Sequence, residues 1–222
     1  MKRVVVTGMG IVSSIGNDVE EVARSLKESR SGISFAPEYE ELNFRCRVHG
    51  KPTLDPTTLL DRRAMRFHGG GTAWNHIAMD QAIADAGLGA DLVSNPRTGI
   101  IMGSGGASTQ TIVQAAEITR NKGGPKRIGP TSVPKAMGST ASATLATWFK
   151  IKGVNYSISS ACATSNHCIG NAYETIQAGR QDIIFAGGCE ELDWTLSALF
   201  DAMGAMSSGF NDRPSEASRA CL

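Results

Sequence analysis

No stretch of the sequence is apolar for long enough to cross a membrane, and the first residues follow a strand pattern without the signal-peptide layout of charge, apolar core and cleavage site. Both absences predict a cytoplasmic protein with no membrane partner. A strong charge of either sign is also missing, because 22 Lys and Arg against 21 Asp and Glu give a net charge of +1. Composition therefore gives no argument for nucleic-acid binding, and an electrostatic partner has to be met by a local patch.

Paired cysteines are missing as well. The cysteines are odd in number, scattered and without a CxxC pair, so the sequence predicts neither a disulfide framework nor a zinc site. His49, His68 and His76 have no cysteine or carboxylate at ligand spacing, which argues against a metal site. The five cysteines are Cys46, Cys162, Cys168, Cys189 and Cys221.

Nucleotide-binding motifs are absent too. The segment GSGGAS, residues 103–108, is rich in glycine and follows an expected strand, which suggests a phosphate cradle. It lacks the spacing of GxGxxG and of GxxxxGK[ST], so a tight turn is the simpler interpretation.

What is present is an alternation of strand-like and helix-like segments with no internal repeat. Over 222 residues, of which 41% are hydrophobic, this alternation predicts an α/β fold with a largely parallel inner sheet. The polar stretch 34–56, interrupted by prolines, is expected to be loop with short strands. Apolar runs and helical spacing predict buried strands at 4–6, 97–102 and 182–186, and helices at about 18–28, 71–86, 108–119 and 135–148.

The segment from Val154 to Gly179 carries the clearest sign of chemistry. It reads as a short β-prone run, a cluster of small residues around Cys162, and a helix. This order predicts that the sulfur lies at a helix N-terminus, where free N–H groups and the helix dipole favour a thiolate. Small neighbours leave room for an acyl group, and the Cys162 N–H can donate to a developing oxyanion. A buried cysteine that acts as a small apolar residue is the alternative.

Two residues shortly after Cys162 are not expected to assist it. His167 and Cys168 follow by five and six positions, and at about 100° per residue their side chains point away from the sulfur on a shared helix. We therefore do not expect His167 to be the base, and we expect Cys168 to pack in the core.

Several runs of the sequence closely resemble the β-ketoacyl-[acyl carrier protein] synthases. They are SISSACATSNHCIGNA around Cys162, QDIIFAGGCEE, FDAMGAMS, the start KRVVVTGMGIVSSIGN, RTGIIMGSGG and PKAMGSTASATLATWFKIKG. The sequence of these runs is more similar to synthase I of bacterial type II fatty acid synthesis than to synthase II. It extends from Lys2 to about Arg219.

The resemblance implies a thiolase-like αβαβα layered fold, of which residues 1–222 form the N-terminal half of a ketoacyl synthase. It also implies that two catalytic histidines, a supporting lysine and a Gly/Phe-rich loop belong to a second half beyond this sequence. The 222-residue chain alone is therefore expected not to catalyse condensation, and apolar faces meant for the second half are expected to favour association. Cys189 stands where relatives commonly have glycine.

The resemblance also assigns roles to individual residues. Cys162 would accept the growing acyl chain as a thioester, and the malonyl-carrier would then lose carbon dioxide and condense with it. Gly106, Met137 and Phe200 would line the acyl pocket, with Met137 contributed by the partner subunit of a homodimer. No metal or diffusible cofactor is implied. For Met137 and Phe200, ordinary core packing remains an alternative.

A basic cluster is the candidate carrier-docking surface. Arg62 and Arg66 are four positions apart and share a helical face. The resemblance places Arg62, Arg63, Arg66 and Lys126 on the surface that docks the acidic acyl carrier protein, where guanidinium groups would bind carboxylates and phosphate. Solvated surface charge is the simpler interpretation. For the whole chain, a polyketide-type ketosynthase and an inactive fragment that only associates are the alternatives.

Overall fold

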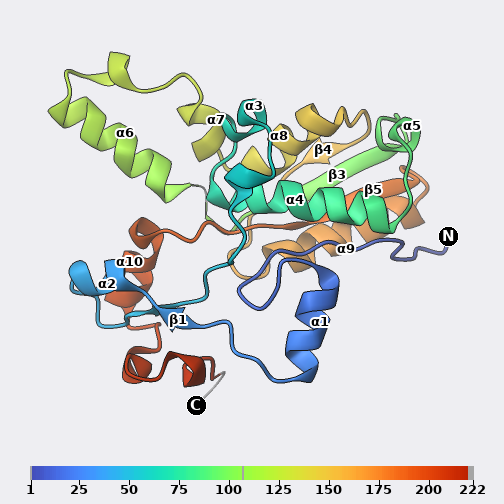
Figure 1. Cartoon of the computed structure of the whole chain (residues 1–222). Helices are drawn as coiled ribbons and strands as arrows, with labels where there is room; N and C mark the ends of the chain where they lie inside the picture. The colour runs from blue at the N-terminus through green and yellow to red at the C-terminus, as the bar shows by residue number, and fades with distance from the viewer. Residues whose placement is uncertain (1, 107, 220–222) are drawn as a thin grey trace. The chain divides into compact units, whose positions relative to one another are not determined.

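The computed structural model describes residues 2–106 and 108–219. They form two compact units. The first unit contains residues 2–10 and Pro56–Glu191, and the second contains Ile11–Asp55 and residues 192–219. Figure 1 labels the elements of both.

The first unit is built on a three-stranded parallel sheet. Its strand order is β4 (Asn155–Tyr156), β3 (Thr98–Gly103) and β5 (Ile183–Gly188). Ile100 of the central strand pairs with Asn155 on one side and with Phe185 on the other. Every residue of β3 is buried, as expected for an apolar strand covered on both faces. The predicted parallel α/β arrangement and the strands near 97–102 and 182–186 are confirmed.

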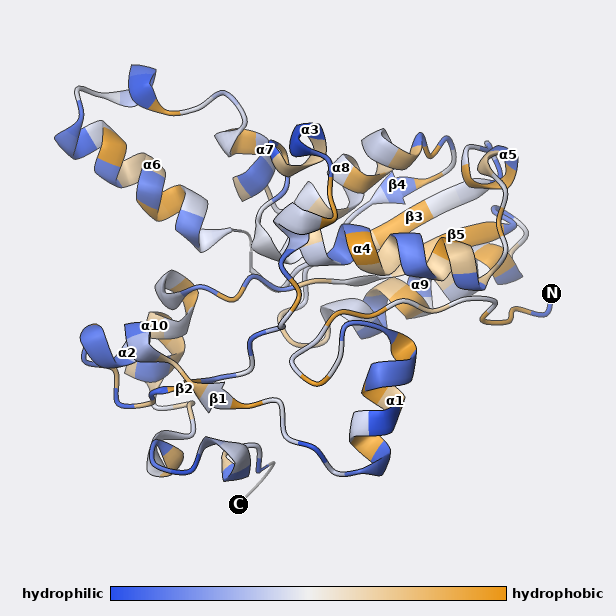
Figure 2. Ribbon diagram, in the orientation of Figure 1, coloured by the Kyte–Doolittle hydropathy of each residue, from blue (hydrophilic) through white to orange (hydrophobic). Residues whose placement is uncertain are grey.

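Helices cover both faces of this sheet, which gives three layers (Figure 1). On one face, Ile100 packs with Met79 of α4 (Gly70–Asp85) and Leu145 of α8 (Thr140–Phe149). On the other face, Ile101 packs with Cys168 of α9 (Thr164–Gln177). Alternate residues of β3 thus enter opposite cores. Figure 2 shows the hydrophobic colouring concentrated on β3 and β5.

Shorter elements connect these layers. The predicted helix at 135–148 is interrupted, because Met137 adopts an extended conformation and a new helix starts after Gly138 and Ser139. The predicted helices at 71–86 and 108–119 are present with ends shifted by one or two residues. The remaining elements of this unit are η1 (Pro56–Thr58), α3 (Arg62–Met65), α5 (Ala90–Val93), α6 (Thr109–Asn121), η2 (Pro125–Arg127) and α7 (Ser132–Ala136).

The predicted buried strand at 4–6 is wrong. Residues 2–12 are extended but join no strand, and Val5 and Val6 are 59% and 80% exposed. Lys2 N–H donates to Gln177 O at 3.1 Å, so the segment is tied to the end of α9 and is not inserted in the sheet. An apolar run forms a buried strand only where a partner strand meets it, and among the described residues Val5 and Val6 have none, although Gly8 and Gly10 further along lie against α4.

The second unit is smaller and less regular. α1 (Val19–Lys27) is the helix predicted at 18–28, and the Asp18 carboxylate caps it by accepting from Glu21 N–H at 2.8 Å. The stretch 34–56 contains the expected short strands, β1 (Ser34–Phe35) paired antiparallel with β2 (Val48–His49), and also the unpredicted helix α2 (Pro37–Glu41). The unit is completed by α10 (Trp194–Met203), η3 (Ser208–Phe210) and η4 (Pro214–Glu216).

No helix in the described part of the chain is both long enough and apolar enough to span a bilayer.

Candidate functional site

The loops at the carboxyl ends of the parallel strands converge. β3 leads into the glycine-rich loop 104–106, β4 into the turn that holds Cys162, and β5 into Glu190 and Glu191. In an open α/β sheet this edge is where ligands bind. Gly103 marks how closely two of these segments approach, because a Cβ there would lie 1.9 Å from Ile158 O. Only glycine fits this approach.

Cys162 lies in a compact turn before α9. It precedes Ala163, the N-cap of the helix, so its sulfur stands just outside the first turn and slightly before the predicted place. Thr164 Oγ1 accepts from Ser160 N–H and donates to Ala161 O, both at 2.8 Å. Ala161 has a positive φ of 47°, a strained conformation for a residue with a Cβ. The turn presents the thiol on the surface, because Cys162 is exposed.

The other cysteines of the described residues differ from Cys162 in burial. Cys46 and Cys168 are buried, and burial raises the pKa of both thiols. Cys189 packs against the core between the sheet and α4, and its burial raises the pKa of its thiol to about 12. The expectation that Cys168 packs in the core is confirmed. Cys221 falls outside the described residues. Cys162 is thus set apart by its exposure.

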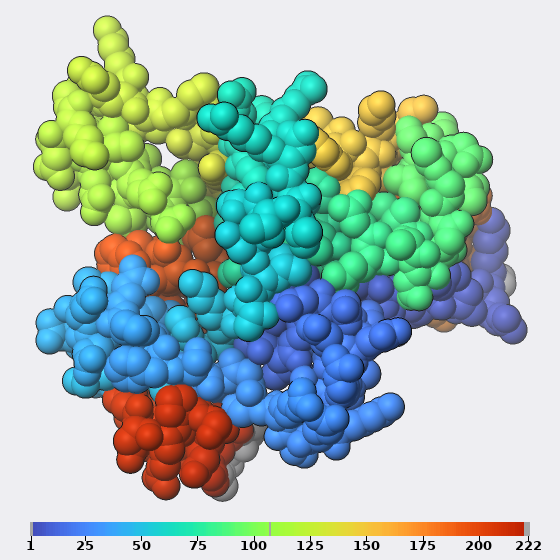
Figure 3. Space-filling model, in the orientation of Figure 1, coloured from blue at the N-terminus to red at the C-terminus, as the bar shows by residue number. Residues whose placement is uncertain are grey.

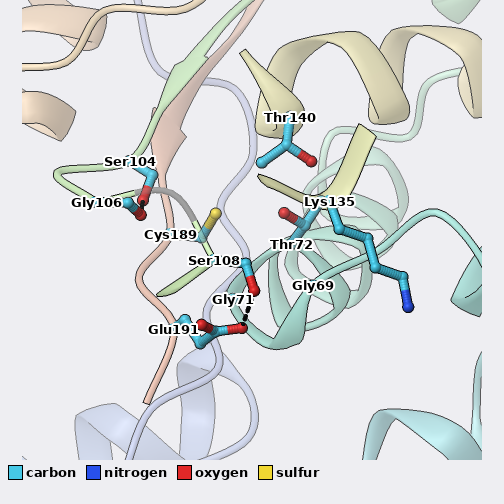
Figure 4. Close-up of a pocket in the computed structure, with 10 residues that line it drawn as sticks. All are labelled: Gly69, Gly71, Thr72, Ser104, Gly106, Ser108, Lys135, Thr140, Cys189 and Glu191. Atoms are coloured by element: carbon cyan, nitrogen blue, oxygen red, sulfur yellow. Dashed lines mark hydrogen bonds between the residues drawn. The ribbon is translucent and has the colours of Figure 1, made fainter. Parts of the chain in front are cut away.

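The glycine-rich loop borders a small cavity at the same edge (Figure 4). The cavity has a volume of about 10 Å³, enough for one water molecule and too small for an acyl chain. Gly106 lines it, as do Cys189 and Lys135. Figure 4 shows the Glu191 carboxylate reaching Ser108, whose Oγ donates to Glu191 Oε1 at 2.7 Å.

Glu190 and Glu191 are site residues that the sequence did not single out. Glu190 accepts from the N–H groups of Gly105 and Gly106, and Glu191 accepts from Gln110 N–H at 3.3 Å. Their partners lie more than 80 positions earlier in the chain. A pair of carboxylates directly after an apolar strand was the available signal, but nothing local identifies the loops that they reach.

The other two predicted pocket residues lie elsewhere in the fold. Met137 is half-buried at the break between α7 and α8, in the first unit. Phe200 belongs to α10 of the second unit and is 42% exposed. Neither is among the described residues that line the cavity beside Gly106.

The predicted basic residues are all on the surface of the first unit. Arg62 and Arg63 belong to the single turn of α3, Arg66 caps it, and Lys126 lies in η2. All four are exposed, and none forms an ion pair within the described part of the chain. The turquoise and yellow-green atoms of these segments reach the visible face in Figure 3. Unpaired exposed cations of this kind are available to an acidic partner.

A buried histidine pair is a further feature that the sequence did not reveal. His68 Nε2 and His76 Nδ1 are 2.8 Å apart, and both side chains are almost fully buried. Burial lowers the pKa of each to about 4, and for His68 the neighbouring His76 and Lys135 add to the effect. Both imidazoles are therefore neutral at pH 7. Among the described residues no group of three or more His, Cys, Asp or Glu is arranged to hold a metal ion.

Comparison with known proteins places this arrangement in context. Residues 1–220 match the family model described as Beta-ketoacyl synthase, N-terminal domain. Two curated relatives are named 3-oxoacyl-[acyl-carrier-protein] synthase 1. The one from Escherichia coli strain K12 is 56% identical and the one from Haemophilus influenzae is 52% identical, each over 99% of this chain. The chain spans about half the length of these relatives, 54% in each case.

Solved structures agree with the sequence comparison. A β-ketoacyl synthase from Burkholderia phymatum is 31% identical with a TM-score of 0.87, over 99% of this chain and 54% of that one. A ketosynthase solved in complex with the acyl-carrier protein of a type II polyketide synthase is 26% identical with a TM-score of 0.75, over 93% and 50%. These likenesses confirm the prediction of a thiolase-like α/β fold, N-terminal half.

Proposed function

Because the chain belongs to the β-ketoacyl synthases, matched over residues 1–220 by their N-terminal domain, we propose that Cys162 accepts an acyl chain in 3-oxoacyl-[acyl-carrier-protein] synthesis. The observation that supports this most directly is the exposed thiol of Cys162 at the carboxyl edge of the parallel sheet. Residues 1–222 act in this proposal as the N-terminal ketoacyl synthase domain of the protein.

The proposed acylation is a thioester exchange. The Cys162 thiolate attacks the carbonyl carbon of an acyl-carrier thioester, a new C–S bond forms, and the carrier thiolate leaves and takes up a proton. The Cys162 N–H is positioned by the turn before α9 and supplies one donor to the oxyanion. No metal or diffusible cofactor is needed for this exchange.

The protein that contains this chain then completes a decarboxylative condensation. Malonyl-carrier loses carbon dioxide, the resulting enolate forms a C–C bond with the acyl carbon, and the Cys162 thiolate is released. Identity of 52–56% with relatives named 3-oxoacyl-[acyl-carrier-protein] synthase 1, against 26% with the polyketide-type ketosynthase, favours fatty acid synthesis over polyketide synthesis. From the family resemblance we further propose that the protein is a cytoplasmic homodimer. In that dimer Gly106, Phe200 and the partner's Met137 would line the acyl pocket.

Mass spectrometry after incubation with acyl-carrier tests the proposed nucleophile. The acyl adduct is expected on the peptide that contains Cys162 and is expected to vanish in Cys162→Ala. Brief iodoacetamide treatment of the unreacted chain is expected to label Cys162 before Cys46, Cys168 and Cys189, because burial raises the pKa of those three thiols. Cys46→Ala is the control and keeps the adduct. An adduct that survives Cys162→Ala contradicts the assignment.

We also propose that Arg62, Arg63, Arg66 and Lys126 dock the carrier protein. Their exposure and their lack of ion pairs with other described residues support this, and a complexed ketosynthase among the structural relatives shows that a related protein binds an acyl-carrier protein. The charges contribute little to folding. Their attraction for an acidic carrier should fall with ionic strength.

Charge reversal tests the docking surface. In Arg62→Glu/Arg66→Glu, carrier association at low salt is expected to slow by about tenfold and to lose much of its salt dependence. The control is Lys27→Glu/Lys152→Glu, which reverses two exposed charges outside the proposed surface. Equal effects of the two double variants would show that net charge, and not this surface, governs association. Stability is expected to change little in both.

A further inference from the structure

Glu190 is bound to the glycine-rich loop by its carboxylate. Oε1 accepts from Gly105 N–H, and Oε2 accepts from Gly106 N–H at 3.3 Å and lies 3.2 Å from Ser104 Oγ. Glu190 is exposed, and the hydrogen bonds of its carboxylate go to Ser104, Gly105 and Gly106 of this loop. Hydrogen bonds from backbone N–H groups to a carboxylate are among the stronger ones.

The loop in turn lies against the turn that carries Cys162. A Cβ added at Gly105 would lie 2.9 Å from Ala161 O and 3.0 Å from Glu190 Oε1. Gly105 is therefore held between the Glu190 carboxylate and the carbonyl of Ala161, which directly precedes Cys162. The same carbonyl accepts from Thr164 Oγ1 within the turn.

Ala161 needs such support. Its φ of 47° is in the left-handed region, and a residue with a side chain persists there only where its surroundings hold it. Its carbonyl oxygen accepts from Thr164 Oγ1 and from Thr164 N–H, and the same oxygen lies against Gly105. Releasing Gly105 would leave this carbonyl held by Thr164 alone among these contacts.

We propose that Glu190 is a positioning residue that fixes the Cys162 turn through the backbone of Gly105. The carboxylate holds the loop, the loop supports Ala161, and Ala161 sets the direction in which the Cys162 thiol is presented. The importance of this positioning for acyl transfer rests on the function proposed above. Glu191, the next residue, has a separate role because it binds Ser108 and Gln110 at the start of α6.

Hydrogen exchange distinguishes positioning from simple loop stability. Glu190→Gln replaces one acceptor oxygen with an amide NH₂ that faces N–H groups. Exchange is expected to accelerate by roughly tenfold in residues 103–106 and also in residues 158–165, as for loss of a charge-assisted hydrogen bond. Glu191→Gln is the matched control and is expected to accelerate exchange in residues 109–112 instead. Faster exchange at 103–106 with no change at 158–165 would overturn the proposal.

A second variant tests the contact itself. Gly105→Ala keeps the Glu190 side chain but drives a methyl group toward both Ala161 O and Glu190 Oε1, so it disturbs both contacts of Gly105 and is expected to accelerate exchange at 158–165 as well. The pH–rate profile of Cys162 alkylation is expected to change in Glu190→Gln and Gly105→Ala and to stay unchanged in Glu191→Gln. An unchanged profile in the first two variants would refute positioning.

Acyl transfer separates this proposal from the proposed function. If wild-type Cys162 is acylated, Glu190→Gln is expected to slow the transfer by roughly tenfold, since a misplaced nucleophile loses alignment. If wild-type Cys162 is not acylated but the exchange and alkylation results hold, the proposed function fails and the positioning role stands.

Discussion

Each of the two units of the chain is stabilised by a different kind of interaction. The first has a continuous apolar core in which Ile100, Ile101 and Leu145 have no exposed surface. The second has small apolar clusters and is joined by side chains that bind backbone: Asp201 accepts from the N–H groups of Arg45 and Cys46 at 3.1 and 2.9 Å. An extended apolar core is stabilised by buried area, whereas a small cluster depends on individual hydrogen bonds.

The difference teaches where a functional loop can be placed. A loop whose conformation is strained, such as the Cys162 turn, needs a rigid base. The turn sits at the edge of a sheet that is packed on both faces. The second unit offers no such layer, and its predicted site residue Phe200 lies on a helix with much exposed apolar surface, including Leu199 and Met203.

The largest expected effect comes from opening the apolar core of the first unit. Leu145→Ala removes a fully buried side chain from the cluster on the sheet and should lower the free energy of unfolding by about 2–5 kcal/mol. Leu199→Ala is the matched change in the second unit, where the side chain is 64% exposed, and should change it by less than about 0.5 kcal/mol. Chemical denaturation measures both. Similar losses would refute the comparison.

The next largest effect is a loss of stability at acidic pH, caused by the buried histidine pair of the first unit. His68 and His76 have a pKa of about 4 in the folded chain, below the ordinary 6.5, so the unfolded chain binds more protons between these values. The full contribution of the pair to the free energy of unfolding is therefore present above pH 6.5 and is lost as pH falls toward 4. For the two histidines together this loss is on the order of a few kcal/mol. Thermal unfolding between pH 7 and 4.5 measures the loss.

Removing the histidines should remove this pH dependence. His76 packs against the rings of Trp148 and Phe149 and lies 3.6 Å from the Asp80 carboxylate, so His68→Met/His76→Phe fills the space with apolar side chains and gives up the Asp80 contact. The double variant is expected to lose less stability than the wild type on acidification. His167→Gln changes an exposed histidine and is expected to leave the pH dependence as it is. A double variant as acid-sensitive as the wild type would assign the acid response to other groups.

The contrast between the layered apolar core of the first unit and the small clusters of the second also explains which elements could be predicted from the sequence. The strands near 97–102 and 182–186 and the helix near 71–86 were predictable, because their apolar periodicity coincides with real burial. The strand predicted at 4–6 was wrong, because an apolar pattern does not reveal whether a partner strand is present. In the second unit, helix α2 and the bonds of Asp201 have no periodic signal to reveal them.

Some residues of the candidate site could likewise be predicted from the sequence and others could not. Cys162 was recognisable from the small residues before a helix and from its resemblance to a known family. Glu190 was not, because its role depends on loop residues 84 and 85 positions away that only the folded sheet brings to it. His68 and His76 are only eight positions apart, but their pairing depends on how the loop before α4 returns the His68 ring to the helix. Contacts between distant loops have no signature in a single sequence.

An intermediate effect is expected from breaking the polar link in the second unit. Asp201→Asn leaves one oxygen to accept from two backbone N–H groups, which should cost about 1–2 kcal/mol. Faster hydrogen exchange at residues 45 and 46 is the expected readout, with the sheet of the first unit unchanged. Asp212→Asn is the control, because that side chain is 84% exposed. A response in β3 as strong as that at residues 45 and 46 would show that the two units unfold as one.

The smallest effect comes from one glycine at the end of a helix in each unit. Gly87 follows α4 with φ 62° and Gly204 caps α10 with φ 75°, and neither would bring a new Cβ closer than 4.0 Å to another group. Alanine at either position meets only backbone strain, about 1 kcal/mol, so both variants should lose similar stability in chemical denaturation. Gly129→Ala and Gly209→Ala, with open space and no positive φ, are the controls and should cost nothing. A loss at Gly204 much larger than at Gly87 would show that the second unit amplifies local strain, and so would sharpen the contrast between a layered core and one held by single bonds.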